Sequence, residues 1–159
     1  MMNLQEEMLR IKNEMIDEFD KRVEALKEEE QEFPQDGDVY WYINPLGFAF
    51  HDEWSGFITE VHKIEIGNVF KTKEQADFAV EKLKVEAELR KFSRTFMWGT
   101  ENTAMLFDGD NIKFDTRLSH VFQGAIYFES ENKAKEAIEA VGEDRIKKYI
   151  FGVEGLIND

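Results

Sequence analysis

Two segments of this chain resemble each other at a constant distance along the sequence. VFKTKEQADFAVEKL, residues 69–83, matches YFESENKAKEAIEAV, residues 127–141, at an offset of 58. The matched positions are the exit of a strand, a hydroxyl residue that can cap a helix, and one apolar helix face. Upstream, FAFH at residues 48–51 corresponds to IKFD at residues 112–115 at an offset of 64. The repeat predicts two copies of one small unit.

Each unit is expected to contain a β-hairpin, a third strand and a helix. In the first unit, β-rich runs at residues 39–43 and 48–54 flank Asn-Pro-Leu-Gly, and a third strand is predicted over residues 58–66. In the second unit, runs at 103–107 and 112–115 flank Asp-Gly-Asp-Asn, which is a strong hairpin signal. Further strands are predicted over residues 95–98 and 120–128.

Capping residues locate the helices of the two units. Thr72 followed by Gln75 has the spacing of a capping box, and Ser130 is a plausible N-cap for a helix over residues 133–141 that Gly142 ends. Residues 149–153 are predicted to form a short extended or docking segment. The first of these helices has apolar residues on two sides, so its second face needs a cover, which the N-terminal helix or a partner chain could supply.

A long amphipathic helix is predicted over residues 3–31, before the first unit. Its apolar residues recur at spacings of three, four or seven: Leu4, Met8, Ile11, Met15, Phe19 and Leu26. The helix ends there because Phe33 precedes a proline and is biased toward extended backbone. Its apolar face is expected to pack either on its own domain or on a second copy.

The predicted fold class is therefore α+β, with the long helix followed by two repeated antiparallel units. The chain divides into an acidic N-terminal helix and linker at residues 1–38, a first unit at 39–92, and a second unit with a C-terminal tail at 93–159. These parts are expected to form one compact domain overall.

The charge of the chain argues against direct binding of nucleic acid. The sequence holds 34 acidic against 20 basic residues, and phosphate binding needs a clustered positive surface. Residues 1–38 hold 13 carboxylates against 5 basic residues, and residues 28–38 hold no base. This acidic run favours a basic partner; alternatively, it is a solvated helix end that keeps the protein soluble.

No motif for catalysis or metal binding is present in the sequence. Cysteine is absent, the three histidines form no helical pair, and no phosphate-binding glycine loop or nucleophile elbow occurs. We therefore predict no enzyme activity, no catalytic residues, no metal and no cofactor. The N-terminus lacks a basic segment and no run of about 18 apolar residues occurs, so no signal peptide or membrane span is expected.

The first predicted hairpin is unusually aromatic. Alternation along a strand places Tyr40 and Tyr42 on one face and Trp41 on the other, so both faces are apolar. One interpretation is that both faces are buried against helices, including the N-terminal one. The other is a contact surface, because Trp and Tyr combine apolar area with a polar tip.

The string IEIGNVFKTKEQADFAVEKLKVEAELRKF, with GEDRIKKYIFGVE near the end and a YWYI strand upstream, resembles a module of uncharacterised phage and prophage proteins of Gram-positive bacteria. The likeness covers roughly residues 39–153. It implies a phage or prophage origin and residence in the host bacterial cytoplasm, but no particular activity. The N-terminal helix lies outside the shared module.

Two functions are expected. The first, by analogy with small acidic phage proteins that inhibit host defence, is a non-enzymatic, anti-CRISPR-like inhibitor that binds a basic, nucleic-acid-handling host protein such as a CRISPR effector nuclease, with acidic residues standing in for phosphates. Its predicted partner-binding residues are Glu28, Glu29, Glu30, Glu32, Asp36, Asp38, Asp52, Glu53 and Trp54. The alternative is a phage accessory or assembly protein that forms a homodimer through the N-terminal helix and has no role against host defence.

Overall fold

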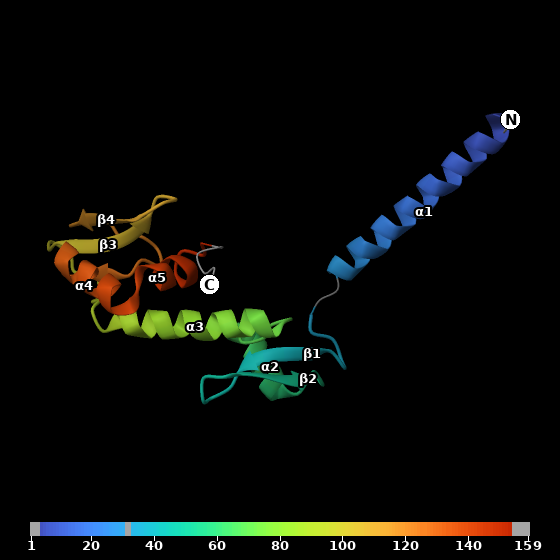
Figure 1. The fold of residues 1–159 in the computed structure, drawn as a ribbon. Coiled ribbons are helices and arrows are strands. Elements are labelled where there is room, and N and C mark those ends of the chain that lie inside the picture. The colour runs from blue at the N-terminus through green and yellow to red at the C-terminus, as the bar shows by residue number, and fades with distance from the viewer. Residues whose placement is uncertain (1–3, 31–32, 154–159) are drawn as a thin grey trace.

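The computed structural model describes residues 4–30 and 33–153, and confirms an α+β fold with helices and two small antiparallel sheets (Figure 1). In α1, the side chains of residues 4, 6 and 24–30 are outside the description. The helices are α1 (Leu4–Glu30), α2 (Ile58–Glu65), α3 (Lys73–Arg90), α4 (Glu131–Val141) and α5 (Glu143–Tyr149). The strands are β1 (Val39–Ile43), β2 (Ala49–Glu53), β3 (Asn102–Phe107), β4 (Ile112–Arg117) and β5 (Tyr127–Phe128).

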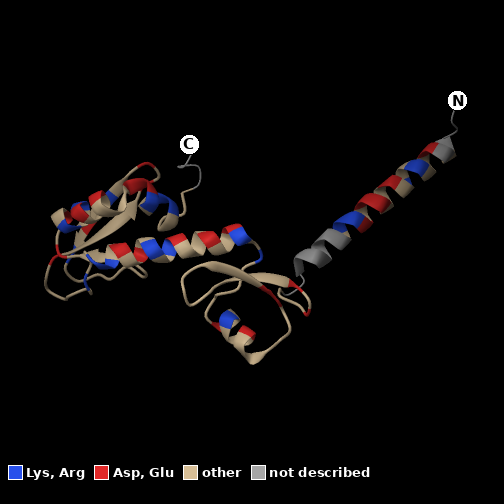
Figure 2. Ribbon diagram, turned by 60° about the horizontal axis from the view of Figure 1, so that its bottom comes forward, with Lys and Arg blue, Asp and Glu red and all other residues tan. Residues whose placement is uncertain are grey.

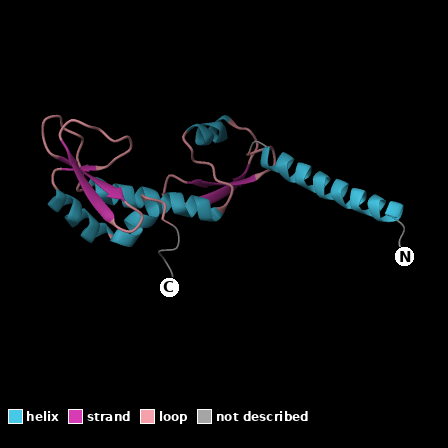
Figure 3. Ribbon diagram, turned by 90° about the horizontal axis from the view of Figure 1, so that it is seen from above, coloured by secondary structure: helices cyan, strands magenta, loops and turns pink. Residues whose placement is uncertain are grey.

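Helix α1 confirms the predicted N-terminal helix and extends away from the other elements (Figures 1 and 3). The described part of its apolar stripe faces solvent rather than the hairpin or α3. The part of the chain that the structure describes thus provides no cover for this stripe.

The strand predicted over residues 58–66 is wrong, because residues 58–65 form helix α2. The carboxylate of Glu60 accepts hydrogen bonds from the backbone N–H groups of Phe57 (2.8 Å) and Ser55 (3.1 Å), which fixes the start of the helix. The β-branched residues Ile58, Val61 and Ile64 suggested a strand, but their spacing of three also suits a helix.

The contacts of helix α3 explain why its sequence is apolar on two sides. Thr72 caps the helix as predicted, with its hydroxyl accepting from the N–H of Gln75 at 3.3 Å. One end of α3 contacts β1 and β2, while the helix also contacts α4 and α5. Val85 and Leu89 of α3 belong to the same core cluster as residues of α4 and α5. The C-terminal helices, rather than α1, therefore supply the second cover.

The second sheet has the order β4-β3-β5 and confirms the Asp-Gly hairpin. The prediction of a strand over residues 95–98 is wrong. The buried amide of Asn102 instead bonds to the backbone of Met97, Thr100 and Arg117, which holds this segment in a turn. Of the strand predicted over 120–128 only Tyr127–Phe128 forms, and Gly124, with φ of 73°, interrupts the rest.

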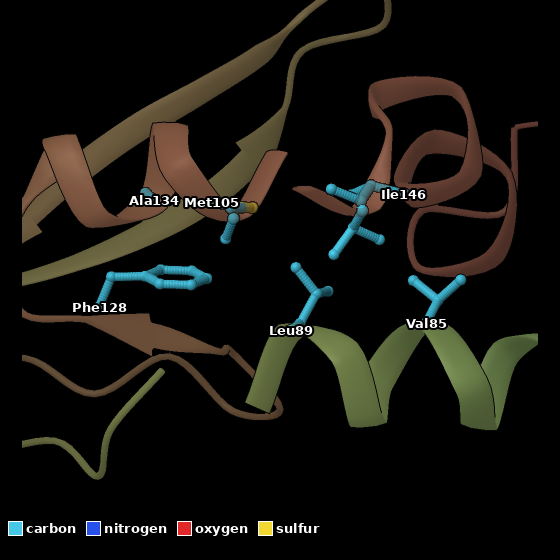
Figure 4. Packing of buried hydrophobic residues seen from close by; sticks show 8 residues of the cluster. Val85, Leu89, Met105, Phe128, Ala134 and Ile146 are labelled. Atoms are coloured by element: carbon cyan, nitrogen blue, oxygen red, sulfur yellow. The ribbon is translucent and has the colours of Figure 1, made fainter. Parts of the chain in front are cut away.

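The main core lies between α3, β3, β5, α4 and α5 (Figure 4). Its buried residues are Val85, Leu89, Met105, Phe128, Ala134, Ala137, Val141 and Ile146. Ser130 caps α4 and Gly142, at φ of 97°, follows it, as predicted. The tail contains helix α5, and beyond it Phe151 docks on Phe107 with ring centroids 5.6 Å apart.

Candidate protein-binding surface

The structure brings five of the predicted partner-binding residues to one end of the first hairpin. Strands β1 and β2 pair antiparallel, with Val39 opposite Glu53 and Tyr40 opposite Asp52. The segment before β1 therefore lies beside the segment after β2 (Figure 2). We call this group the acidic hairpin end; its members are Asp36, Asp38, Asp52, Glu53 and Trp54. Glu32 lies outside the described residues, and so do the side chains of Glu28, Glu29 and Glu30.

Backbone hydrogen bonds hold the two segments of the acidic hairpin end together. The N–H of Trp54 donates to the carbonyl of Asp38 and the N–H of Gly37 donates to the carbonyl of Trp54, both at 2.8 Å. The carboxylate of Asp38 accepts from the N–H of Gln35 at 2.8 Å, and that of Asp52 accepts from the N–H of Glu53 at 3.0 Å. These bonds fix the backbone that carries the carboxylates.

Among the side chains that the structure describes, the carboxylates of the acidic hairpin end have no cationic partner. No ion pair between these side chains joins Asp36, Asp38, Asp52 or Glu53 to a lysine or arginine. Asp36, Asp52 and Glu53 are exposed to solvent. Their negative charge is therefore available to a basic partner.

The outer edge of β1 is covered by other parts of the chain. Trp41 and Phe70 exchange two backbone hydrogen bonds of 2.9 and 2.8 Å. Next to them, the side-chain amide of Asn68 accepts from the N–H of Ile43 at 2.7 Å and donates to its carbonyl at 2.8 Å. Asn68 thus makes the two hydrogen bonds to Ile43 of β1 that a neighbouring strand would make.

The outer edge of β2 is open. Because Trp41 directs its backbone groups toward Phe70, its pair with His51 is not hydrogen-bonded, and the backbone N–H and C=O of His51 point away from β1. By the same alternation, the backbone groups of Ala49 and Glu53 face outward, although the N–H of Glu53 is already bonded to the carboxylate of Asp52. In the described part of the chain no other strand pairs with this edge. An edge of this kind can accept an extended segment of another chain.

Exposed aromatic side chains accompany the open edge. Phe48 and Phe50 keep 64% and 55% of their surface exposed, and Phe57, just before α2, keeps 69%. Phe50 packs edge-on against Tyr42, with ring centroids 6.2 Å apart. The hairpin therefore offers apolar contact area beside its carboxylates.

A hydrogen-bonded network supports the hairpin from the side of α2. The ammonium of Lys63 donates to the hydroxyl of the buried Tyr40 at 2.6 Å and lies 3.6 Å from the ring centre of Tyr42. Burial, together with the negative charges of Glu60 and Asp52, raises the pKa of Tyr40 to about 12. Burial would raise the pKa of Glu60, but hydrogen bonds from Phe57 and Ser55 lower it below its usual value.

The edge of the second sheet differs from that of β2 in its charge. On β4, Arg117 pairs with Asp115 at 2.8 Å, and Lys113 lies 3.6 Å from Asp108 in the adjoining turn. These charges neutralise one another. The open edge of β2 is thus the more strongly acidic of the two.

The described residues contain no group of three or more acidic or histidine side chains placed to hold a metal ion. None of the helices described in the structure is long and apolar enough to cross a membrane. Comparisons of the chain with family models, curated proteins and solved structures gave no match.

Sequence reasoning located the acidic hairpin end but missed the open edge and the supporting network. The hairpin pattern alone places the residues before β1 beside those after β2. The open edge depends on Phe70 and Asn68 occupying the other side of β1, which is a long-range contact. The sequence did contain a signal for the start of α2, since a glutamate such as Glu60 in the first turn commonly caps a helix.

Proposed function

We propose that this protein is a phage-encoded, non-enzymatic inhibitor that binds a basic, nucleic-acid-handling host protein of the CRISPR effector class. The open, acidic edge of β2 is the observation that carries this proposal. In the proposed complex, an extended basic segment of the partner pairs with β2. The lysine or arginine side chains of that segment contact the carboxylates of the acidic hairpin end.

Each part of the surface has a separate role in this function. The outward backbone groups of Ala49 and His51 give hydrogen bonds that do not depend on the partner's sequence. The exposed carboxylates attract a positively charged partner and discourage pairing between two copies of this acidic edge. Phe48 and Phe50 provide apolar contacts that slow dissociation.

Charge reversal at the edge tests the proposal. The double variant Asp52→Lys and Glu53→Lys is titrated into a purified, guide-loaded CRISPR effector nuclease at two salt concentrations. We expect the unaltered protein to bind and inhibit cleavage, with affinity that falls as salt rises, and the variant to lose both effects.

A matched control removes the effect of net charge. Glu101→Lys with Asp110→Lys makes the same change of charge at exposed positions of the second unit. This control is expected to bind nearly as tightly as the unaltered protein. The proposal is wrong if both double variants weaken binding equally, or if effector nucleases of this class show no affinity for the protein.

A second candidate function is a self-associating phage accessory or assembly protein with no defence role. The exposed apolar stripe of α1 favours it, because such a surface commonly marks a protein contact. A stable homodimer without affinity for any effector nuclease would support this candidate over the first.

We also infer that the two units arose by duplication of one hairpin, strand and helix. Phe70 and Phe128, which are 58 residues apart, each pair with the first strand of their own unit, at Trp41 and Thr103 respectively. The units differ because α2 stands before Phe70 in the first, whereas a loop stands before β5 in the second.

A further inference from the structure

Helix α1 carries an apolar stripe, interrupted by Lys12, that nothing covers in the described structure. Six large apolar residues on it keep between 46% and 66% of their surface exposed: Met8, Leu9, Ile11, Met15, Ile16 and Phe19. Their spacing of three and four residues places them along one side of the helix. A helix with such a stripe gains most of its stability by packing it against another surface.

The charge of α1 argues against a membrane as that surface. Residues 4–30 hold ten acidic and five basic residues. Helices that lie on bilayers are usually rich in lysine and arginine, because the headgroup surface is negative. An acidic helix is repelled from such a surface.

The exposed apolar face around α2 is too short to cover the stripe. Helix α2 and its flanking residues expose Phe57, Ile58, Val61, Ile64 and Ile66. Its eight residues span about 12 Å, whereas the stripe from Met8 to Val23 spans about 22 Å at 1.5 Å per residue. A second α1 has a stripe of the same length.

We propose that α1 pairs with α1 of a second copy in antiparallel orientation, with Met15 of the two copies near the two-fold axis. In this arrangement each stripe covers the other along its whole length. The pairing is isologous, so it closes at a dimer and forms no filament.

The acidic run selects the antiparallel orientation. Residues 28–38 contain six carboxylates and no base. Parallel helices would place the two runs side by side, with strong repulsion. Antiparallel helices of 27 residues hold them about 40 Å apart, well beyond the screening length of about 8 Å at physiological salt.

A pair of opposite charges supports the same orientation. On a helical wheel, Glu7 and Arg22 lie about 60° apart on the same side of the stripe's centre line, eight residues before Met15 and seven residues after it. An antiparallel pair centred on Met15 therefore brings Glu7 of one copy beside Arg22 of the other. The two-fold axis makes this contact twice.

The pairing gives the molecule two copies of the open β2 edge, one beyond each end of the helix pair. A dimer can then engage two sites of an assembled partner, and the second contact benefits from a high effective concentration. The pairing itself does not depend on the proposed inhibitor function, and its test uses no nuclease.

Chemical cross-linking tests the orientation directly, since the chain has no cysteine of its own. Met8→Cys and Val23→Cys chains with tags of different size are treated with a short bismaleimide, separately and mixed. In the antiparallel pair, residue 8 lies within one residue of the level of residue 23 of the other copy, while the two residues 8 are about 21 Å apart. We expect the mixed product and little of either self-linked product.

Controls separate orientation from random collision. Asp17→Cys, on the opposite side of the helix, is expected to give no cross-linked product. Light scattering is expected to give twice the 18.7 kDa chain mass for the unaltered protein, and a single chain mass for Phe19→Glu with Met15→Glu. Circular dichroism establishes that the variants keep the folded second unit.

Two results would overturn the proposal. Self-linking of Met8→Cys chains would show that the helices run parallel. A monomeric mass at all accessible concentrations would show that another surface, such as the region around α2, covers the stripe.

Discussion

Asn68 is the residue whose replacement most directly tests how the first sheet is closed. Its amide makes two hydrogen bonds of 2.7 and 2.8 Å to the backbone of Ile43, which sits at the covered edge of β1. Asn68→Ala leaves both backbone groups without a partner. At about 1 kcal/mol for each bond, the expected loss of unfolding free energy is about 2 kcal/mol. For a chain of this size, that loss corresponds to a fall of about 4–8 °C in Tm.

Denaturant unfolding followed by circular dichroism measures this loss. The midpoint is expected to fall at unchanged slope, since the surface exposed on unfolding stays similar. Asn68→Asp is the matched comparison: it keeps an acceptor for the N–H of Ile43 but turns a carboxylate oxygen toward the carbonyl. It is expected to be less stable than Asn68→Ala at neutral pH. A loss below about 0.5 kcal/mol in Asn68→Ala would refute the role assigned to this amide.

Three further predictions concern stability and titration. The difference between the absorbance titrations of the unaltered protein and of Tyr40→Phe is expected to have a midpoint near pH 12. Because the pKa of Tyr40 is raised in the folded protein, the contribution of its hydroxyl to stability is complete below pH 10 and is lost between pH 10 and 12. Phe128→Ala, at a fully buried core position, is expected to cost about 3–5 kcal/mol in denaturant unfolding. Glu88→Gln breaks a two-bond ion pair to Arg145 at 3.0 and 3.1 Å, but both side chains are about one-third exposed, so the expected cost is about 1 kcal/mol or less. The hydrogen bond from Arg145 lowers the pKa of Glu88, so in a pH series this difference is expected to vanish as pH falls below about 4.5; an undiminished difference in acid would contradict it.

Local signals predicted much of the fold. The caps at Thr72 and Ser130 set the starts of α3 and α4, and the turns after β1 and β3 set the two hairpins. These features depend on residues within a few positions of one another, so a single sequence contains them.

The errors arose where distant contacts or competing patterns decide the structure. Residues 58–66 have both strand-forming side chains and helical spacing, and the cap made by Glu60 decides in favour of a helix. Residues 95–98 are held in a turn by the amide of Asn102. The second cover of α3 is the C-terminal unit, whose position follows from the packing of Val85 and Leu89.

The candidate surface was only partly predictable for the same reason. The acidic hairpin end follows from the hairpin pattern, since Asp38 and Trp54 flank paired strands. The open edge of β2 follows from the bridge between Trp41 and Phe70, which joins residues 29 positions apart.

Amide hydrogen exchange of the complex tests the central claim most directly. When the protein is bound to a guide-loaded effector nuclease, the outward N–H groups of Ala49 and His51 are expected to become protected from exchange. The outward N–H groups of Phe114 and Thr116, on the charge-neutralised edge of β4, are expected to exchange as in the free protein. Binding that leaves Ala49 and His51 unprotected would contradict docking on the edge of β2.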